Sequence, residues 1–193
     1  MRILGISGSP RQGGNTEIAV RHALKTISDE GLDTEFVSLA ELPVLPCVAC
    51  GGCRNFATPK CVQNDPNFDL ILQKVIEADG LIVGSPVYFS SATPQLMALL
   101  DRIGYVTRPN LVLRRKVGAA IAVARRAGTN FTFAQMNYFF LISEMIVPGS
   151  TYWNNAFGLK PGDVEQDEEG MQTITSLAKN VAWLVKKLTE PVA

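Results

Sequence analysis

One stretch combines glycines with side chains that bind anions: residues 7–16, which read Ser-Gly-Ser-Pro-Arg-Gln-Gly-Gly-Asn-Thr. It joins a short apolar run at residues 2–6 to an amphipathic helix. The free N–H groups of a helix's first turn and the positive end of its dipole favour a bound phosphate. The loop lacks both the Gly-x-Gly-x-x-Gly of dinucleotide sites and the Gly-Lys-Ser/Thr of triphosphate sites. The sequence therefore predicts a site for a terminal monophosphate; the alternative is a polar turn capped by Asn15 or Thr16.

A second stretch could bind a metal or carry out redox chemistry. It holds all four cysteines of the chain, Cys47, Cys50, Cys53 and Cys61. No secretory signal precedes the first strand, and no apolar run is long enough to span a bilayer, so we expect a cytoplasmic protein with reduced thiols. Cysteines crowded together in a reducing compartment indicate a metal or redox site rather than disulfide bonds.

The composition places both stretches in a globular protein. Of the 193 residues, 47% are hydrophobic and 19% are charged, which is enough to build a core. We expect a single domain over residues 1–193, with an insertion that carries the cysteines at about residues 40–66. Lys+Arg and Asp+Glu both number 18, which gives no support for binding to nucleic acid or to a membrane. A neutral surface also makes self-association easier.

Apolar runs and amphipathic segments alternate along the chain. The predicted strands are 2–6, 34–39, 81–84, 117–124 and about 146–149, and the predicted helices are 16–30, 68–78, 94–103, 131–144 and 167–188. This alternation predicts an α/β fold: a doubly wound, five-stranded parallel sheet of flavodoxin-like order 2-1-3-4-5, with helices on both faces and a cysteine-rich loop after strand 2. Ligands of such sheets bind beyond the carboxyl ends of the strands, so the loops after strands 1, 3 and 4 should meet at one crevice.

Three motifs resemble the NADPH-dependent FMN reductase superfamily. They are Gly-Ser-Pro-Arg-x-x-x-Asn-Thr after the first strand, Gly-Ser-Pro-Val-Tyr-Phe after the third, and the pair Asp101-Arg102 in the third helix. The order of elements is similar over essentially the whole chain. The cysteine spacing, Cys-x2-Cys-x2-Cys-x7-Cys, resembles the compact motif of the iron–sulfur flavoproteins of anaerobic archaea and bacteria. The resemblance implies FMN, a [4Fe–4S] cluster, and homodimers or homotetramers that pass electrons between the two centres.

The resemblance implies that the predicted monophosphate belongs to FMN. The expected ligands of this phosphate are Ser9, Arg11, Asn15 and Thr16. It also implies that one loop lies along the isoalloxazine ring, with contacts from Pro86, Val87, Tyr88 and Phe89. The loop after the fourth strand should form a third wall from Arg125, Arg126, Ala127 and Gly128. Cations there would stabilise the anionic reduced flavin. The alternatives are that the aromatics pack under the third helix and that the arginines form a solvated turn.

The cysteine spacing favours a cluster over other occupants. Three cysteines separated by two residues, with a more distant fourth, are common ligands of a [4Fe–4S] cluster, and Gly51 and Gly52 give the loop freedom to curl. No proline follows Cys61, in contrast to ferredoxins. Structural zinc usually takes two separated Cys-x2-Cys knuckles, so zinc and unligated thiols are the less favoured alternatives.

These sites favour a flavin-dependent oxidoreductase. A ferredoxin-type donor would supply electrons to the cluster, and FMN would pass them to a small oxidant such as oxygen, peroxide or a quinone. We assign no catalytic acid, base or nucleophile, and expect His22 to be an ordinary helix residue. One alternative is an NAD(P)H-dependent FMN or quinone reductase without a cluster; another is a non-enzymatic flavin or thiol redox sensor.

The position of the cysteines bears on assembly. They follow strand 2, at the edge of the sheet, whereas the flavin ring is expected over strands 3 and 4. The resemblance implies that the cluster serves the flavin of a neighbouring subunit, so we expect an oligomer whose interface includes residues 40–66. The aromatic-rich region at 131–140 could be substrate wall, subunit interface or ordinary core.

Overall fold

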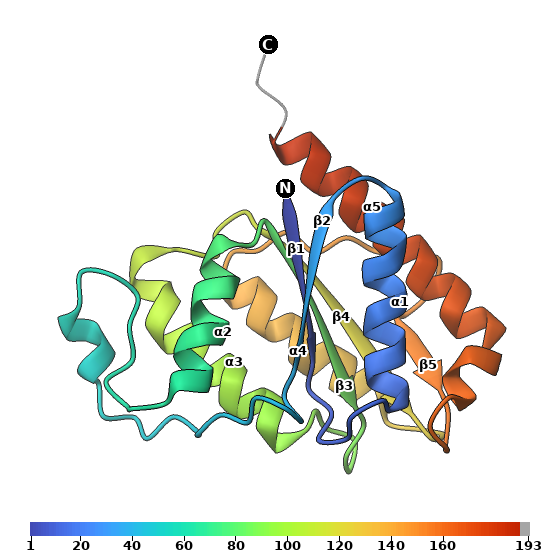
Figure 1. Ribbon diagram of the computed structural model, residues 1–193, viewed down its shortest axis with the longest axis horizontal. Helices are drawn as coiled ribbons and strands as arrows, with labels where there is room; N and C mark the ends of the chain where they lie inside the picture. Colours follow the sequence, from blue (N-terminus) through green and yellow to red (C-terminus); the bar gives the residue numbers. More distant parts are fainter. Residues whose placement is uncertain (190–193) are drawn as a thin grey trace.

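The computed structural model describes residues 1–189 of the chain and contains a five-stranded parallel sheet. The strands follow the order β2-β1-β3-β4-β5 (Figure 1), which confirms the predicted flavodoxin-like sheet. Their bounds are Arg2–Ser7 (β1), Asp33–Ser38 (β2), Gly80–Pro86 (β3), Val117–Ala124 (β4) and Asn155–Phe157 (β5). Every residue of β4 is buried, because helices cover both faces of the sheet centre.

Two layers of helices enclose the sheet. Helices α1 and α5 pack on one face through a core that includes Ile3, Val20 and Leu177, and helices α2, α3 and α4 pack on the other (Figure 1). The helices span Asn15–Asp29 (α1), Pro66–Glu77 (α2), Pro94–Thr107 (α3), Thr129–Ile142 (α4) and Glu168–Thr189 (α5). Short 3-10 turns lie at Gly52–Asn55 (η1), Arg108–Asn110 (η2) and Asp163–Gln166 (η3).

The edge strand lies later in the chain than predicted. The prediction of a strand at about residues 146–149 is wrong, because Ile146 makes only a single parallel bridge, to Val117. The strand that extends the sheet is β5, at Asn155–Phe157. Pro148 has no N–H to donate to a ladder, so the chain leaves the sheet edge there and rejoins it further on. Since Asn has low strand propensity, the short β5 carries little signal in the sequence.

Side-chain caps set the start of two helices. Thr93 caps α3: its hydroxyl accepts a hydrogen bond from Leu96 N–H at 3.3 Å, and Pro94 takes the first helical position. Helix α2 starts two residues earlier than predicted, because the Asp65 carboxylate accepts from Phe68 N–H at 3.2 Å. Caps of this kind satisfy N–H groups that have no acceptor within the helix.

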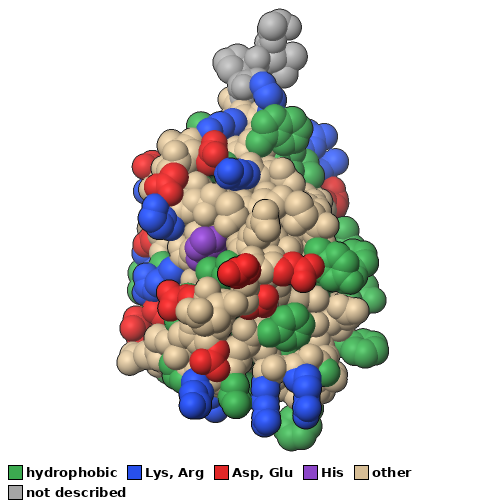
Figure 2. Space-filling view, turned by 90° about the vertical axis from the view of Figure 1, so that its right-hand side faces the viewer, with side chains coloured by type: hydrophobic (Ala, Val, Ile, Leu, Met, Phe, Trp, Pro, Cys, Tyr) green, Lys and Arg blue, Asp and Glu red, His purple; other side chains and the backbone are tan. Residues whose placement is uncertain are grey.

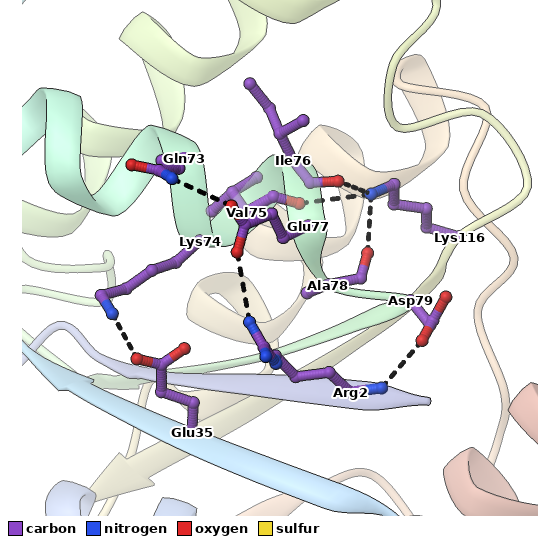
Figure 3. A network of polar contacts seen from close by, with 10 residues as sticks. All are labelled: Arg2, Glu35, Gln73, Lys74, Val75, Ile76, Glu77, Ala78, Asp79 and Lys116. Carbon is purple, nitrogen blue, oxygen red and sulfur yellow. Dashed lines mark hydrogen bonds and ion pairs between the residues drawn. The ribbon is translucent and has the colours of Figure 1, made fainter.

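Polar contacts occupy the end of the sheet at which the strands begin (Figure 3). Lys116 directly precedes β4, and its Nζ donates to the main-chain oxygens of Ile76, Val75 (3.4 Å) and Ala78 (2.6 Å) at the end of α2. Burial lowers the pKa of Lys116, and nearby Asp79 opposes that shift. A lysine at a helix C-terminus satisfies carbonyls that would otherwise lack donors. This end of the sheet is therefore occupied by structural contacts.

The outer face formed by α1 and α5 carries acidic and basic side chains intermixed (Figure 2). Arg21 pairs with Glu17 at 2.8 Å and Lys25 with Asp29 at 2.7 Å, both one helical turn apart. Among residues 1–189, no helix is both long and apolar enough to cross a membrane.

Candidate functional site

The loop after β1 ends in a helix N-terminus without a side-chain cap. The cap residue of α1 is Gly14, and no side chain accepts a hydrogen bond there, so the cap at Asn15 or Thr16 that the alternative expected is wrong. The first intrahelical bond runs from Ile18 N–H to Gly14 at 3.1 Å. The N–H groups of residues 15–17 therefore have no acceptor within the helix. An anion can accept from them and also meets the positive end of the helix dipole.

Contacts with β3 and α3 hold this loop in shape. Gly8 N–H donates to Gly84 at 2.7 Å, and the Thr93 hydroxyl donates to the Gly8 carbonyl at 2.6 Å. A Cβ at Gly8 would lie 2.7 Å from Leu96, so only glycine allows this approach. The Ser9 hydroxyl accepts from Arg11 N–H at 3.1 Å. The loop is therefore pre-shaped by bonds that do not involve a ligand.

Asn15 ties the loop at residues 7–16 to the segment 158–164, which the sequence analysis did not single out. Its Nδ2 donates to the Lys160 carbonyl at 2.9 Å, and its Oδ1 accepts from Gly162 N–H at 2.9 Å. A Cβ at Gly158 would lie 2.6 Å from Asn15 Nδ2. The side-chain amide of Asn15 is thus engaged within the protein, and the donor it offers an anion is its backbone N–H.

A tight turn follows β3. Tyr88 and Ser91 exchange two main-chain hydrogen bonds of 2.9 and 3.0 Å, and the two residues between them have positive φ, +50° at Phe89 and +61° at Ser90. Positive φ at both central positions is the geometry of a type I′ turn, which usually takes Asn or Gly rather than Phe. The Phe89 side chain is fully exposed at the tip. It therefore does not pack beneath α3, as one alternative required.

The loop after β4 supports this turn. Val87 N–H donates to Val123 at 2.9 Å, which joins the two loops where the strands end. Gly128 has φ of +87°, and a Cβ there would lie 2.8 Å from Ser90 Oγ and 2.9 Å from Val87. Gly128 therefore packs against the turn. Arg126 is exposed.

These loops line one pocket of about 240 Å³. Of the predicted FMN contacts, it brings together Ser9, Arg11, Asn15, Thr16, Pro86, Val87, Tyr88 and Arg125. The others lie outside its lining: Phe89, Arg126, Ala127 and Gly128. Among the described residues, the charged side chains that line it are both arginines, so the pocket favours an anion.

Six further lining residues were missed: Gly14, Val123, Ala124, Gly158, Leu159 and Pro161. The last three follow β5, so they reach the crevice by the same rule as the other loops, at the carboxyl end of a parallel strand. Placing the fifth strand too early in the chain hid that signal.

The four cysteines line a second pocket, of about 160 Å³. All are free thiols. The loop curls through two residues of positive φ, Ala49 at +52° and Gly51 at +71°, and Ala49 N–H donates to Cys47 Sγ at 3.4 Å. The segment that carries them extends outward past α2 and α3 (Figure 1). The predicted metal ligands therefore face one pocket.

The cysteine thiols are not gathered around a common centre for a single ion. Within residues 1–189, no three His, Cys, Asp or Glu side chains are grouped around a position for one metal ion. Zinc needs its ligands around one centre, so the zinc alternative gains no support. In a cluster the thiolates bind separate irons. The free thiols and the N–H donor at Cys47 suit that chemistry, and hydrogen bonds to sulfur are a normal part of such sites.

A buried ion pair clamps the two ends of the cysteine segment. Asp65 accepts from Leu45 N–H at 2.8 Å and pairs with Arg102, whose Nη1 also donates to the Leu45 carbonyl at 3.0 Å. Desolvation acts to raise the pKa of Asp65, but hydrogen bonds from Leu45, Arg102 and Phe68 outweigh it, so that pKa is lowered. The sequence analysis noted Arg102 only as part of a motif, because burial of an arginine cannot be read from residue type.

The aromatic-rich helix has two faces. Met136, Phe139 and Phe140 are buried in the core, whereas Tyr138 and Leu141 are exposed. The outer face, with residues 147–154, lines an apolar groove of about 810 Å³. The region is therefore only in part ordinary core.

The architecture and the loops define a flavodoxin-like protein with an anion-binding crevice. A flavodoxin from Archaea superposes with a TM-score of 0.63 at 16% identity, over 96% of this chain and 99% of that one; at this identity the likeness shows the fold alone. The family model of the NADPH-dependent FMN reductases matches residues 1–159.

Two relatives show which group within the family this chain resembles. The chain is 45% identical to an iron–sulfur flavoprotein of Methanocaldococcus jannaschii, over 96% of this chain and 98% of the relative. It is 40% identical to one of Methanosarcina thermophila, over 94% and 93% respectively. The chain therefore belongs to the NADPH-dependent FMN reductase family and, within it, to the iron–sulfur flavoproteins, which confirms the resemblance predicted from its motifs. It is an FMN-dependent redox protein of a flavin-dependent oxidoreductase family.

Proposed function

We propose that this chain passes electrons between a [4Fe–4S] cluster at the four cysteines and FMN in the crevice, and delivers them to a small oxidant such as oxygen, peroxide or a quinone. One observation carries the proposal: the cysteines face one pocket, and the three predicted loops face another. When bound, the two cofactors supply the chemistry, single electrons at the cluster and pairs at the flavin. A ferredoxin-type protein is the proposed electron donor.

The residues of the crevice have separate tasks in this proposal. The first-turn N–H groups of α1, the hydroxyls of Ser9 and Thr16, and the Arg11 guanidinium hold the phosphate. Pro86, Val87 and Tyr88 would contact the isoalloxazine ring. The tight turn after β3 holds these three residues in place. Arg125 adds a positive charge that favours the anionic reduced flavin.

The two pockets share no lining residue. The cysteine segment also extends away from the sheet (Figure 1). Both observations support the proposal that the protein is a homodimer or homotetramer, in which the cysteine segment of one subunit, residues 40–66, lies near the FMN of another. Residues of the exposed apolar groove beside α4 could add area to such an assembly.

Anaerobic purification with metal and flavin analysis tests the proposal. We expect about four irons and about four sulfides per chain, as a [4Fe–4S] cluster requires, together with bound FMN. A matched variant, Cys61→Ser, should lose cluster and keep FMN. A yellow, iron-free protein from an anaerobic preparation would contradict the cluster, and an iron-containing protein without flavin would contradict the crevice assignment.

A glycine substitution tests the crevice on its own. In Gly158→Ala the new Cβ would meet Asn15 Nδ2 at 2.6 Å and Val164 N at 2.8 Å, which should push the 158–164 segment away from the phosphate loop. We expect FMN affinity to fall about tenfold, about 1.4 kcal/mol, in a fluorescence titration of the apoprotein. Gly149→Ala is the control, since nothing lies within 4 Å of that position. Equal affinities in both variants would contradict the assignment.

The family itself favours a second candidate, an NAD(P)H-dependent FMN or quinone reductase, because its model is that of NADPH-dependent FMN reductases. In that case a nicotinamide would reduce the flavin directly and the cysteines would carry no cluster. Anaerobic mixing separates the two: flavin bleached by NADPH but not by reduced ferredoxin selects the second candidate, and the opposite result selects the first.

A further inference from the structure

Arg102 keeps unused hydrogen-bond donors inside the protein. The residue is 1% exposed, and Nη1 alone makes its polar contacts, to Leu45 and Asp65. The Nε and Nη2 groups have no partner among residues 1–189. The guanidinium carbon lies 3.8 Å from the centroid of the Phe68 ring, so one face of the group is covered. Buried N–H groups without acceptors are costly, so their occurrence calls for an acceptor that completes them.

Arg102 is one of the residues that line the cysteine pocket, together with all four cysteines. Tyr105 follows Arg102 by one turn of α3, and its carbonyl lies 3.8 Å from Cys53 Sγ. Within the described residues, the charged side chains in the wall are Arg102 and Arg54, with no carboxylate. Both charges of the wall are therefore positive, but Arg102 is buried whereas Arg54 is exposed to solvent.

Sulfur atoms of an iron–sulfur cluster are acceptors that suit these donors. Thiolate and sulfide sulfurs carry negative charge, which increases on reduction, and N–H groups directed at them stabilise the reduced form and raise the potential. We propose that Arg102 donates from Nε and Nη2 to sulfur atoms of the bound cluster and thereby raises its reduction potential. This inference rests on the proposed function, since it requires that the cysteines hold a cluster.

A purely structural role accounts for only part of the residue. Clamping the segment ends uses Nη1, through Leu45 and Asp65, and leaves Nε and Nη2 unexplained. A clamp affects folding and cluster retention, whereas a donor to sulfur also sets the potential. Arg102 is thus a positioning and tuning residue, and the potential of the loaded protein distinguishes the two roles.

The test compares Arg102→Lys with Arg54→Lys in anaerobically prepared protein. Lysine keeps the charge and can pair with Asp65, but it lacks the planar guanidinium that donates to Asp65 and to a second acceptor at the same time. We expect Arg102→Lys to retain iron and sulfide, and its equilibrium constant for one-electron reduction of the cluster to fall about tenfold, about 59 mV. The exposed Arg54→Lys should leave the potential unchanged. The FMN potential, recorded in the same titration, should be unmoved in both.

The outcomes separate two failures. Wild-type protein without iron and sulfide would overturn the proposed function. Wild-type protein with a cluster, but with the same potential in Arg102→Lys, would overturn this inference alone, as would an equal shift in Arg54→Lys. Should Arg102→Lys fail to fold, the pair Arg102→Met with Asp65→Asn removes the donors and the carboxylate together. We expect the same downward shift there, and an unchanged potential in it would count against the proposal.

Discussion

Two cations, the half-buried Lys116 and the buried Arg102, have opposite surroundings. Lys116 Nζ donates to the carbonyls of Val75, Ile76 and Ala78 (Figure 3). In Arg102, only Nη1 has hydrogen-bond acceptors, and Nε and Nη2 have no partner within residues 1–189. Both sites lie next to helix α2, one at its end and the other at the ion pair that caps its start.

The difference supports the proposal that a ligand binds at the cysteine segment. A cation whose donors are all used holds the chain together and does no more. A buried cation with unused donors retains a capacity that folding alone does not use. Proteins keep such incomplete contacts mainly where function requires them. The contrast therefore separates the structural end of the sheet from the cysteine segment.

The largest expected effect comes from breaking the buried ion pair. In Arg102→Met the Asp65 carboxylate stays buried without its partner, which should lower the free energy of unfolding by about 3–5 kcal/mol. Urea unfolding of the cluster-free protein measures it. Adding Asp65→Asn should restore part of the loss. A loss below that of Lys116→Met would remove the basis of the comparison.

A smaller loss is expected at the other cation. Lys116→Met removes the donor from three carbonyls at the end of α2. Leaving such groups unpaired costs about 1–3 kcal/mol, and water can recover part of it because the site is only half-buried. The same urea measurement applies. FMN content and cluster potential should not change, and a change in either would show that Lys116 is more than structural.

Acid should expose the smallest effect. The folded-state pKa of Asp65 is lowered, because hydrogen bonds from Leu45, Arg102 and Phe68 outweigh the desolvation that acts to raise it. Its contribution is complete above the unfolded pKa of about 3.9 and is lost as the pH falls through the lower folded value. Between pH 7 and acid conditions, wild-type protein should lose more stability than the variant with Arg102→Met and Asp65→Asn. Parallel pH profiles would contradict this sign.

Much of the fold follows from local pattern. Unbroken apolar runs at β3 and β4, the Thr93–Pro94 helix start and the alternation of elements gave the correct sheet order. The error at β5 had a local cause as well. The apolar pair at 146–147 carries a stronger strand signal than Asn155–Phe157, yet Pro148 interrupts pairing at the edge.

The sequence by itself determined the family, the fold, the position of the loop after β1 and the cysteine set, because each depends on residue type and on spacing within a short stretch. Only the tertiary structure decided which loops share a pocket, that Asn15 binds the 158–164 segment, and that Phe89 is exposed and does not line the crevice. Only the tertiary structure shows that Arg102 contacts the cysteine segment, through a hydrogen bond to Leu45, which lies 57 residues earlier in the chain. Burial and pairing arise from contacts between segments far apart in the chain, and no local pattern encodes them.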